Sequence, residues 1–324
     1  MNARRFFLCL IAFFLGMTGF PILAQEATAG TAPLSFEVVK SAAEKGNSYF
    51  QGILAGAYRR GEMGAEPDYA EALKWAEKSA EAKNPLGFYN LAVIYEQGLG
   101  VKKDPEKGLQ NYQKALPEMR KLAEAGDPLA QYCYAYMILK GKGIQADPAA
   151  AAQWFEKSAA GGNSVAQYLV ASKYLRGDGV PQDNLKALEL MRKSAEQGFA
   201  ESQFALGMMI LGNGTVKVNY TEAFVWIMKA ASRGNADAEF VAASMLESGK
   251  GTQADIRQAL DLYNKAALHG NEKAKLKMKG MLEKVKESVD SKDSSASPAT
   301  PAVPALPAKQ PSAASKENTP VSGK

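Results

Sequence analysis

The chain has 324 residues, with 39 Lys and Arg, 34 Asp and Glu and one His, and its formal net charge is +5. This near balance argues against nucleic acid as a partner, because nucleic acids favour proteins with dense basic faces. With two Cys and one His in the whole chain, no cluster of transition-metal ligands is expected. We therefore expect neither a metal site nor a cofactor.

Residues 1–24 have the order of a secretory signal peptide. Two arginines, Arg4 and Arg5, precede an apolar run from Phe6 to Phe20, Pro21 breaks the run, and Ala24 offers a small residue for cleavage. The run is too short and wrongly flanked for a permanent membrane span. The sequence thus predicts cleavage after Ala24, a periplasmic or secreted protein without a membrane span, and a linker over 25–34. An uncleaved membrane anchor is the alternative.

Glycines recur with a fixed period through the centre of the chain: Gly126, Gly162, Gly198, Gly234 and Gly270 are 36 residues apart. Between them, an apolar run at helical spacing ends at a Gly-rich loop, and a second run follows. A fixed period in this range indicates supersecondary units stacked in one direction. We predict an all-α, right-handed α-solenoid superhelix of about six helix-turn-helix repeats with capping helices, over residues 35–288.

Within each unit, the loop glycines suit a left-handed helix end. An Asp or Asn recurs at the same position of each unit, where its short side chain suits the N-cap of the second helix. These residues are Asp68, Asp104, Asp147, Asp183, Asn219 and Asp255. The second unit has seven extra residues around Pro117, which is expected to kink or end its helix. At the two ends, Ser35–Lys45 reads as an incomplete unit's second helix and Asn271–Ser288 as a polar first helix.

The fourth unit carries a family resemblance. Ala166-Gln167, the loop Gly177-Asp178-Gly179-Val180 with Asp183, and Lys193-Ser194-Ala195 resemble one unit of the Sel-one-like repeat family, cousins of tetratricopeptide repeats. The resemblance covers about Gly46 to Gly270. It implies a scaffold, adaptor or regulator in envelope machinery or host contact, with a protein or peptide partner. Two units depart from the pattern: the second has Gly108 and Asn111 where Ala and Trp are usual, and the fifth shifts its loop by one residue.

Residues 289–324 lose aromatic and large apolar side chains. Pro298, Pro301, Pro304 and Pro307 recur at every third residue, the period of a polyproline II helix. Such a composition cannot bury a core, so we predict a disordered tail that acts as a spacer.

A candidate binding surface follows from the register. In five units, the residue six positions after the start of the unit is aromatic and lies on the first helix. Eight positions beyond that site on the first helix, three units carry a basic residue. We call the aromatic set the ladder: Tyr89, Tyr132, Tyr168, Phe204 and Phe240. The basic set is Arg60, Lys140 and Arg176. In related helix-pair solenoids first helices line the concave side, so the two sets predict a groove for a peptide or partner domain.

Three other interpretations remain open. The ladder could pack between units as core, or it could stack on sugar rings in a protein that binds carbohydrate or cell wall. A concealed pair of carboxylates could make the chain a hydrolase. Against an enzyme, the chain lacks a nucleophile elbow, a Ser-x-x-Lys pair and any histidine besides His269. We expect a binding protein and no catalytic residues, with Cys133 as a buried small apolar residue.

Overall fold

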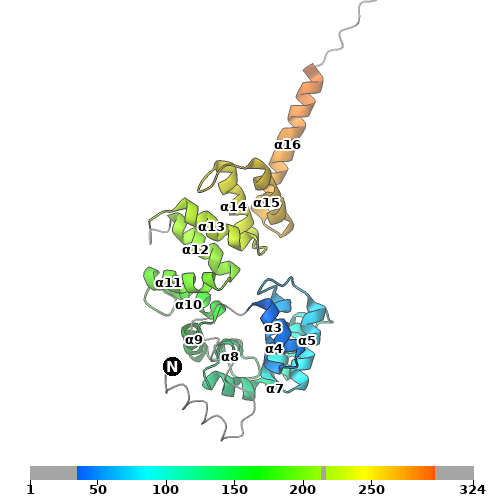
Figure 1. The fold of residues 1–324 in the computed structure, drawn as a ribbon, viewed down its shortest axis with the longest axis vertical. Coiled ribbons are helices and arrows are strands. Elements are labelled where there is room, and N and C mark those ends of the chain that lie inside the picture. The colour runs from blue at the N-terminus through cyan, green and yellow to red at the C-terminus, as the bar shows by residue number, and fades with distance from the viewer. Residues whose placement is uncertain (1–34, 213–216, 296–324) are drawn as a thin grey trace, which may run out of the picture. The chain divides into compact units, whose positions relative to one another are not determined.

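The computed structural model describes residues 35–212 and 217–295. The expected signal peptide, the linker up to residue 34 and residues 296–324 of the expected tail lie outside this part of the chain. Every regular element in the described part is an α-helix (Figure 1). The chain divides into two compact units, one ending at Met278 and one beginning at Lys279. The first unit holds the repeats, and the second, as far as it is described, holds the rest of α16 up to Ser295.

Six helix pairs form the first unit and confirm the predicted all-α solenoid. The first helices of the pairs are α4 (Ser48–Arg60), α6 (Pro85–Gln97), α8 (Pro128–Lys140), α10 (Ser164–Arg176), α12 (Ala200–Gly212) and α14 (Ala236–Ser248). The second helices are α5 (Tyr69–Glu81), α7 (Pro105–Glu124), α9 (Pro148–Ala160), α11 (Asn184–Glu196), α13 (Tyr220–Ala231) and α15 (Ile256–Leu268). From α3 to α15, each helix packs against the next along the chain, as α10 does against α11 (Figure 1). None of the described helices combines the length and the apolar character needed to cross a bilayer.

The helix ends follow the caps expected from the sequence. All six predicted Asp and Asn residues are N-caps of second helices, as where Asp147 Oδ1 accepts from the Ala150 amide at 2.9 Å. At the other end, Gly98 closes α6 in the left-handed conformation with a φ of 75°. A carboxylate at a helix start satisfies amides that have no partner within the helix. Local chemistry therefore fixes where most helices begin and end.

Small and amide side chains join the helices. In the fourth repeat, Ser194 Oγ donates to the Ser164 carbonyl at 2.7 Å, and Gln167 Nε2 donates to the Ala159 carbonyl of the previous repeat at 3.3 Å. The Gln contact recurs eight residues back from Gln51, Gln131 and Gln203. Since these Gln side chains are buried, the repeat carries a built-in polar contact between neighbouring pairs.

The second repeat keeps two continuous helices although its sequence departs from the repeat pattern. α7 runs continuously to Glu124 with Pro117 inside it, so of the two expected effects of Pro117, a kink or an end of the helix, the end is wrong. Pro117 is exposed, which leaves room for the proline ring. Gly108, at the usual Ala position, is close-packed, because a Cβ there would lie 3.0 Å from the Ala92 carbonyl oxygen.

Incomplete pairs stand at both ends of the repeat array. Within residues 35–295, α3 (Phe36–Glu44) is a second helix without its first, and α16 (Glu272–Ser295) is a first helix without its second. Val38 on α3 is 52 % exposed and Leu276 on α16 is 70 % exposed, at positions where complete pairs bury more of the side chain. α16 continues past Ser288, where the sequence analysis ends the solenoid.

Candidate functional site

The ladder residues all lie on first helices, and their exposure differs. Tyr89 is buried, whereas the other four keep part of their surface accessible. The rings also contact other aromatic rings, with centroid distances of 5.8 Å for Tyr89–Tyr112, 5.8 Å for Tyr132–Phe155, 5.5 Å for Tyr168–Phe199 and 5.5 Å for Phe240–Tyr263. Tyr89 is thus a core residue, and the rings with an exposed part are those that a ligand can touch.

Arg60, Lys140 and Arg176 each end a first helix and are exposed. Arg60 Nε lies 2.6 Å from Glu62 Oε1. Although desolvation opposes it, this carboxylate raises the pKa of Arg60, and Tyr132 and Tyr89 are close enough to contribute. Within the described residues, Lys140 and Arg176 make no ion pair. Arg60 therefore lies within electrostatic range of two ladder residues. Among the described residues, none of the three basic side chains forms a hydrogen bond or an ion pair with a ladder residue.

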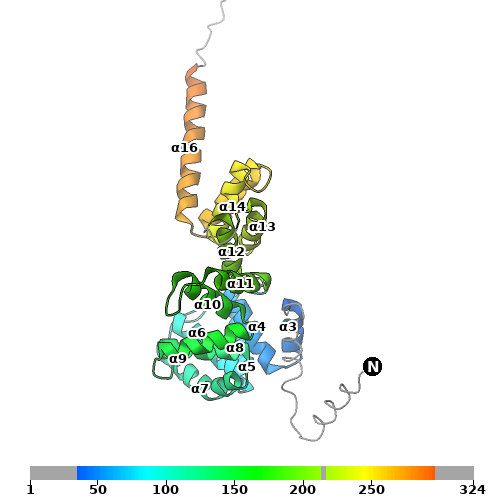
Figure 2. The ribbon, with the colours of Figure 1, turned by 90° about the vertical axis from the view of Figure 1, so that its left-hand side faces the viewer.

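Three first helices converge in the N-terminal half of the solenoid. α4 packs on α6, and a Cβ on Gly52 would lie only 2.5 Å from Leu86 Cβ. Tyr49 Oη on α4 donates to Asp127 Oδ2 at the start of α8, at 2.6 Å and across 78 residues of chain. Burial first, and then Asp127, raises the pKa of Tyr49 well above its ordinary value. Figure 2 shows α4, α6 and α8 in the same region of the unit.

Arg59 and Asn90 lie at this convergence, and the sequence analysis missed both. Arg59 Nε donates to Asn90 Oδ1 at 3.2 Å. Asn90 Nδ2 donates in turn to the carbonyls of Gly52 and Leu86, each at 2.9 Å. The only signal in the sequence was the Arg59-Arg60 pair, of which the repeat register selected the second member.

A second polar cluster lies where α6 faces α7. Tyr112 Oη donates to Glu96 Oε2 at 3.1 Å, and Lys142 forms an ion pair with Glu96. Burial is the main cause that raises the pKa of Tyr112, and Glu96 adds to it. Glu96 is thus engaged by both neighbours.

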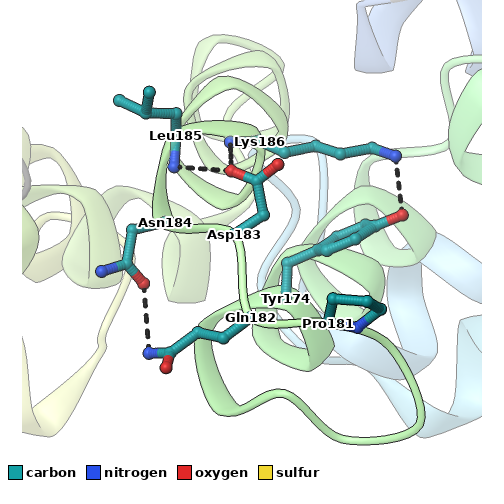
Figure 3. A pocket seen from close by; sticks show the side chains of 7 residues that line it. All are labelled: Tyr174, Pro181, Gln182, Asp183, Asn184, Leu185 and Lys186. Atoms are coloured by element: carbon teal, nitrogen blue, oxygen red, sulfur yellow. Dashed lines mark hydrogen bonds between the residues drawn. The ribbon is translucent and has the colours of Figure 1, made fainter.

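The loop between α10 and α11 forms an open depression of about 620 Å³ (Figure 3). Lys186 Nζ donates to Tyr174 Oη at 2.6 Å, and Asp183 caps α11 by accepting from the amides of Leu185 and Lys186. The second repeat has a similar pair, with Lys107 Nζ 3.8 Å from the centroid of the Tyr95 ring. Since its polar groups bind one another, this depression is a feature of the repeat loop and not a separate site.

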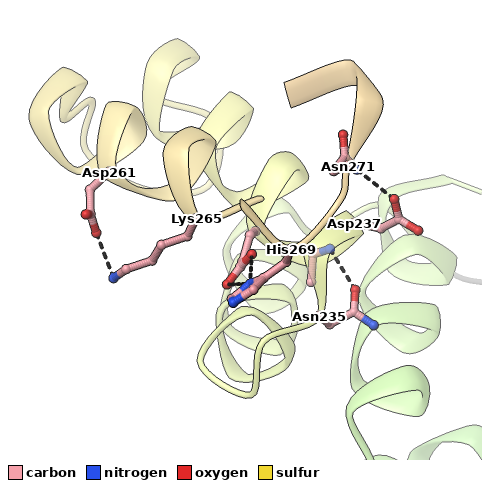
Figure 4. Close-up of polar contacts among 8 residues, drawn as sticks. Asn235, Asp237, Asp261, Lys265, His269 and Asn271 are labelled. Atoms are coloured by element: carbon pink, nitrogen blue, oxygen red, sulfur yellow. Dashed lines mark hydrogen bonds and ion pairs between the residues drawn. The ribbon is translucent and has the colours of Figure 1, made fainter. Parts of the chain in front are cut away.

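The last repeat differs at the buried amide position. Glu239, 2 % exposed, stands where four other repeats have Gln, and His269 Nδ1 lies 2.8 Å from its Oε2 (Figure 4). His269 is also the C-cap residue of α15. The fourth repeat has Gln197 Nε2 donating to Gln167 Oε1 at 2.9 Å, with the same spacing of 30 residues. The pair therefore replaces an amide contact between repeats.

These features define the class of protein: an all-α solenoid of repeated helix pairs, with aromatic and basic side chains on the first helices. In the described residues, no group of three or more His, Cys, Asp and Glu could hold a metal ion. Six segments match the Sel1 repeat, at residues 50–84, 89–116, 128–163, 164–199, 200–235 and 236–271. The chain belongs to the Sel1 repeat family, whose members generally act as scaffolds for protein–protein interaction.

Several solved structures are similar to this chain. A Sel1 repeat protein from Oxalobacter formigenes is 27 % identical, with a TM-score of 0.50 over 76 % of this chain and 79 % of that one. A protective antigen with an SLR fold, from uropathogenic Escherichia coli strains, is 30 % identical, with a TM-score of 0.47 over 76 % of this chain and 52 % of that one. An immunity protein from Pseudomonas aeruginosa is 20 % identical, with a TM-score of 0.47 over 76 % and 87 %. No curated protein matches the chain.

Proposed function

We propose that this chain is an exported scaffold that binds a protein or peptide on the first-helix face of its N-terminal repeats. The supporting observation is the convergence of α4, α6 and α8, which brings Arg60 towards Tyr89 and Tyr132. A half-buried aromatic ring beside a guanidinium suits an extended peptide, because the ring adds contact area and the cation attracts carboxylates.

Photo-crosslinking in cells tests this proposal. A photoreactive residue replaces Tyr132 on α8, and the matched control replaces Glu156, which is exposed on the second helix α9 of the same repeat. We expect a short set of proteins crosslinked through position 132 and absent from position 156. Equal crosslinking from both positions, or none from 132, contradicts the assignment of this face.

Export is proposed from the sequence of residues 1–24. It predicts that the mature protein begins at Gln25 and is recovered from the periplasm or the medium. Intact-mass measurement of the purified protein gives the processed start, and retention of residues 1–24 on a membrane-bound form would support the anchor instead.

Carbohydrate or cell-wall binding is the second candidate, because Tyr132 and Tyr168 keep part of their surface exposed. Replacing both by Ala should then abolish sedimentation with purified cell wall, while Glu156→Ala leaves it unchanged. Hydrolysis receives no such support: Glu96 on α6 is engaged by Lys142 and Tyr112, and Glu62, just after α4, is engaged by Arg60. A general acid or base needs a carboxyl group free to act on substrate.

A further inference from the structure

Arg59 carries a charge that no ion pair within the described residues neutralises. Its guanidinium has one hydrogen bond among the described residues, to the amide oxygen of Asn90 at 3.2 Å. Within the same residues, no carboxylate lies within ion-pair distance of it. An ion removed from water without a counter-ion is costly to the fold.

The neighbouring carboxylates are already engaged. Glu62 pairs with Arg60 at 2.6 Å, and Glu96 binds Lys142 and Tyr112. Asp127 accepts from Tyr49 Oη and from the Ala130 amide, both at 2.6 Å. Each of them would have to break one of these contacts to turn to Arg59.

The position of Arg59 is fixed and enclosed. Because both Nδ2 hydrogens of Asn90 bind backbone carbonyls, its Oδ1 is directed at Arg59 Nε. Arg59 is half-buried, and α6 and α8 surround it. Desolvation first, and then the charge of Arg60, lowers the pKa of Arg59, while Tyr89, Glu62 and Cys133 act in the opposite direction without reversing the shift. A fixed, half-buried guanidinium whose Nη groups are free among the described residues can be reached by a ligand and is better oriented than an exposed arginine.

We propose that Arg59 is the anchor for a carboxylate of the bound partner, with its Nη groups as donors and its Nε held by Asn90. This proposal rests on the proposed function and specifies its chemistry: a peptide segment with an acidic side chain or a free C-terminus at the convergence of α4, α6 and α8. Arginine suits this role because its planar fork can bind both carboxylate oxygens. Tyr132, half-buried beside it, would contact the neighbouring residue of the peptide.

The test follows the arginine Nε–Hε resonances by NMR while three hexapeptides are added to the full processed chain. One has an internal Glu and an amidated C-terminus, one has Gln there and a free C-terminus, and one has Gln and an amidated C-terminus. We expect saturable shifts of the Arg59 resonance with one or both carboxylate peptides, and none with the neutral one. Arg176, exposed and at the end of α10, serves as the internal control and should show only weak, non-saturating shifts.

Which carboxylate peptide saturates identifies the source of the charge. Arg59→Met should weaken the binding of that peptide at least tenfold and Arg176→Met less than twofold, while Arg59→Lys, which keeps the charge but not the fork, falls between them. Equal, linear shifts at Arg59 and Arg176, or equal binding of the neutral peptide, overturn the proposal. Should Arg59→Met fail to fold, the titration of the wild-type resonances decides alone.

The two proposals fail separately. If Tyr132 crosslinks a partner but the Arg59 resonance does not respond to carboxylates, only the anchor is wrong. If Arg59 binds a carboxylate peptide but position 132 captures no protein, the anchor stands and the proposed scaffold function does not.

Discussion

Gly87 on α6 is the position where the repeat packing can be tested most directly. A Cβ there would lie 2.3 Å from the Ala80 amide nitrogen and 2.6 Å from the Ser79 carbonyl carbon of α5. Both are backbone atoms, so no side-chain rotation relieves the overlap and the two helices must move apart. We therefore expect Gly87→Ala to destabilise the protein.

The size of the effect follows from two opposing contributions. Overpacking costs about 3 kcal/mol at the upper end of its usual range. Replacing glycine by alanine in a helix returns about 0.5–1 kcal/mol. The net loss is about 2 kcal/mol, which lowers the melting temperature by about 4–8 °C for a domain of this size.

Circular dichroism melts provide the measurement, with Gly280→Ala as the matched control. Gly280 is also helical, but a Cβ there meets nothing within 4 Å. The control variant should melt at or slightly above the wild-type temperature, because only the gain in helix propensity remains. A Gly87→Ala variant that melts at the wild-type temperature or higher would refute the reasoning that α5 and α6 depend on this close approach.

Three further predictions concern buried and titrating groups. Changing Glu239 and His269 together to Gln reproduces the Gln167–Gln197 contact, so the free energy of unfolding in urea should stay within about 1 kcal/mol of wild type. Glu239→Ala should lower it by about 1–3 kcal/mol because buried polar groups lose a partner, and equal losses in both variants would contradict the pairing. Hydrogen bonds from Tyr263 and Lys277 hold the pKa of Glu247 below its usual 4.5. This carboxylate therefore stabilises the fold above its unfolded-state pKa, and the stability is lost as the pH falls through the lowered folded-state pKa. The difference in melting temperature between wild type and Glu247→Gln should thus be constant from about pH 6 to pH 7 and shrink below about pH 4.5; a difference that persists at pH 3 would contradict this role. Burial raises the pKa of Cys133 to about 12, so iodoacetamide at pH 8 should label it in urea and leave it unlabelled in the folded chain from which residues 1–24 are removed; rapid labelling without urea would contradict its burial.

Much of this protein could be predicted from its sequence because the information is local and repeated. The period of 36 residues, the capping carboxylates such as Asp147 and the left-handed glycines such as Gly98 each act within a few residues of chain. Because the same pattern recurs in six units, it can be recognised even where a single unit has a different residue. Burial of Cys133, 3 % exposed, followed from its place on an apolar helix face in the same way.

The candidate site depended on contacts between repeats. The sequence register treated Tyr89 and Tyr132 as equivalent, yet Tyr89 is 5 % exposed and Tyr132 is half-buried. It selected Arg60 and passed over Arg59, because the phase of a helical repeat identifies a face but not the residue that faces a neighbouring helix. Lys140 and Arg176, chosen by the same phase, make no contact with the ladder by hydrogen bond or ion pair.

The sequence by itself determined the helix pairs, their caps and their stacking order, since short-range hydrogen bonds and apolar periodicity set them. Tertiary structure alone decided which side chains meet. Tyr49 reaches Asp127 across 78 residues, and His269 reaches Glu239 across 30. Such contacts depend on how closely successive pairs approach, and that approach is set at points such as Gly52 and Gly87, where the absence of a Cβ lets two backbones come together.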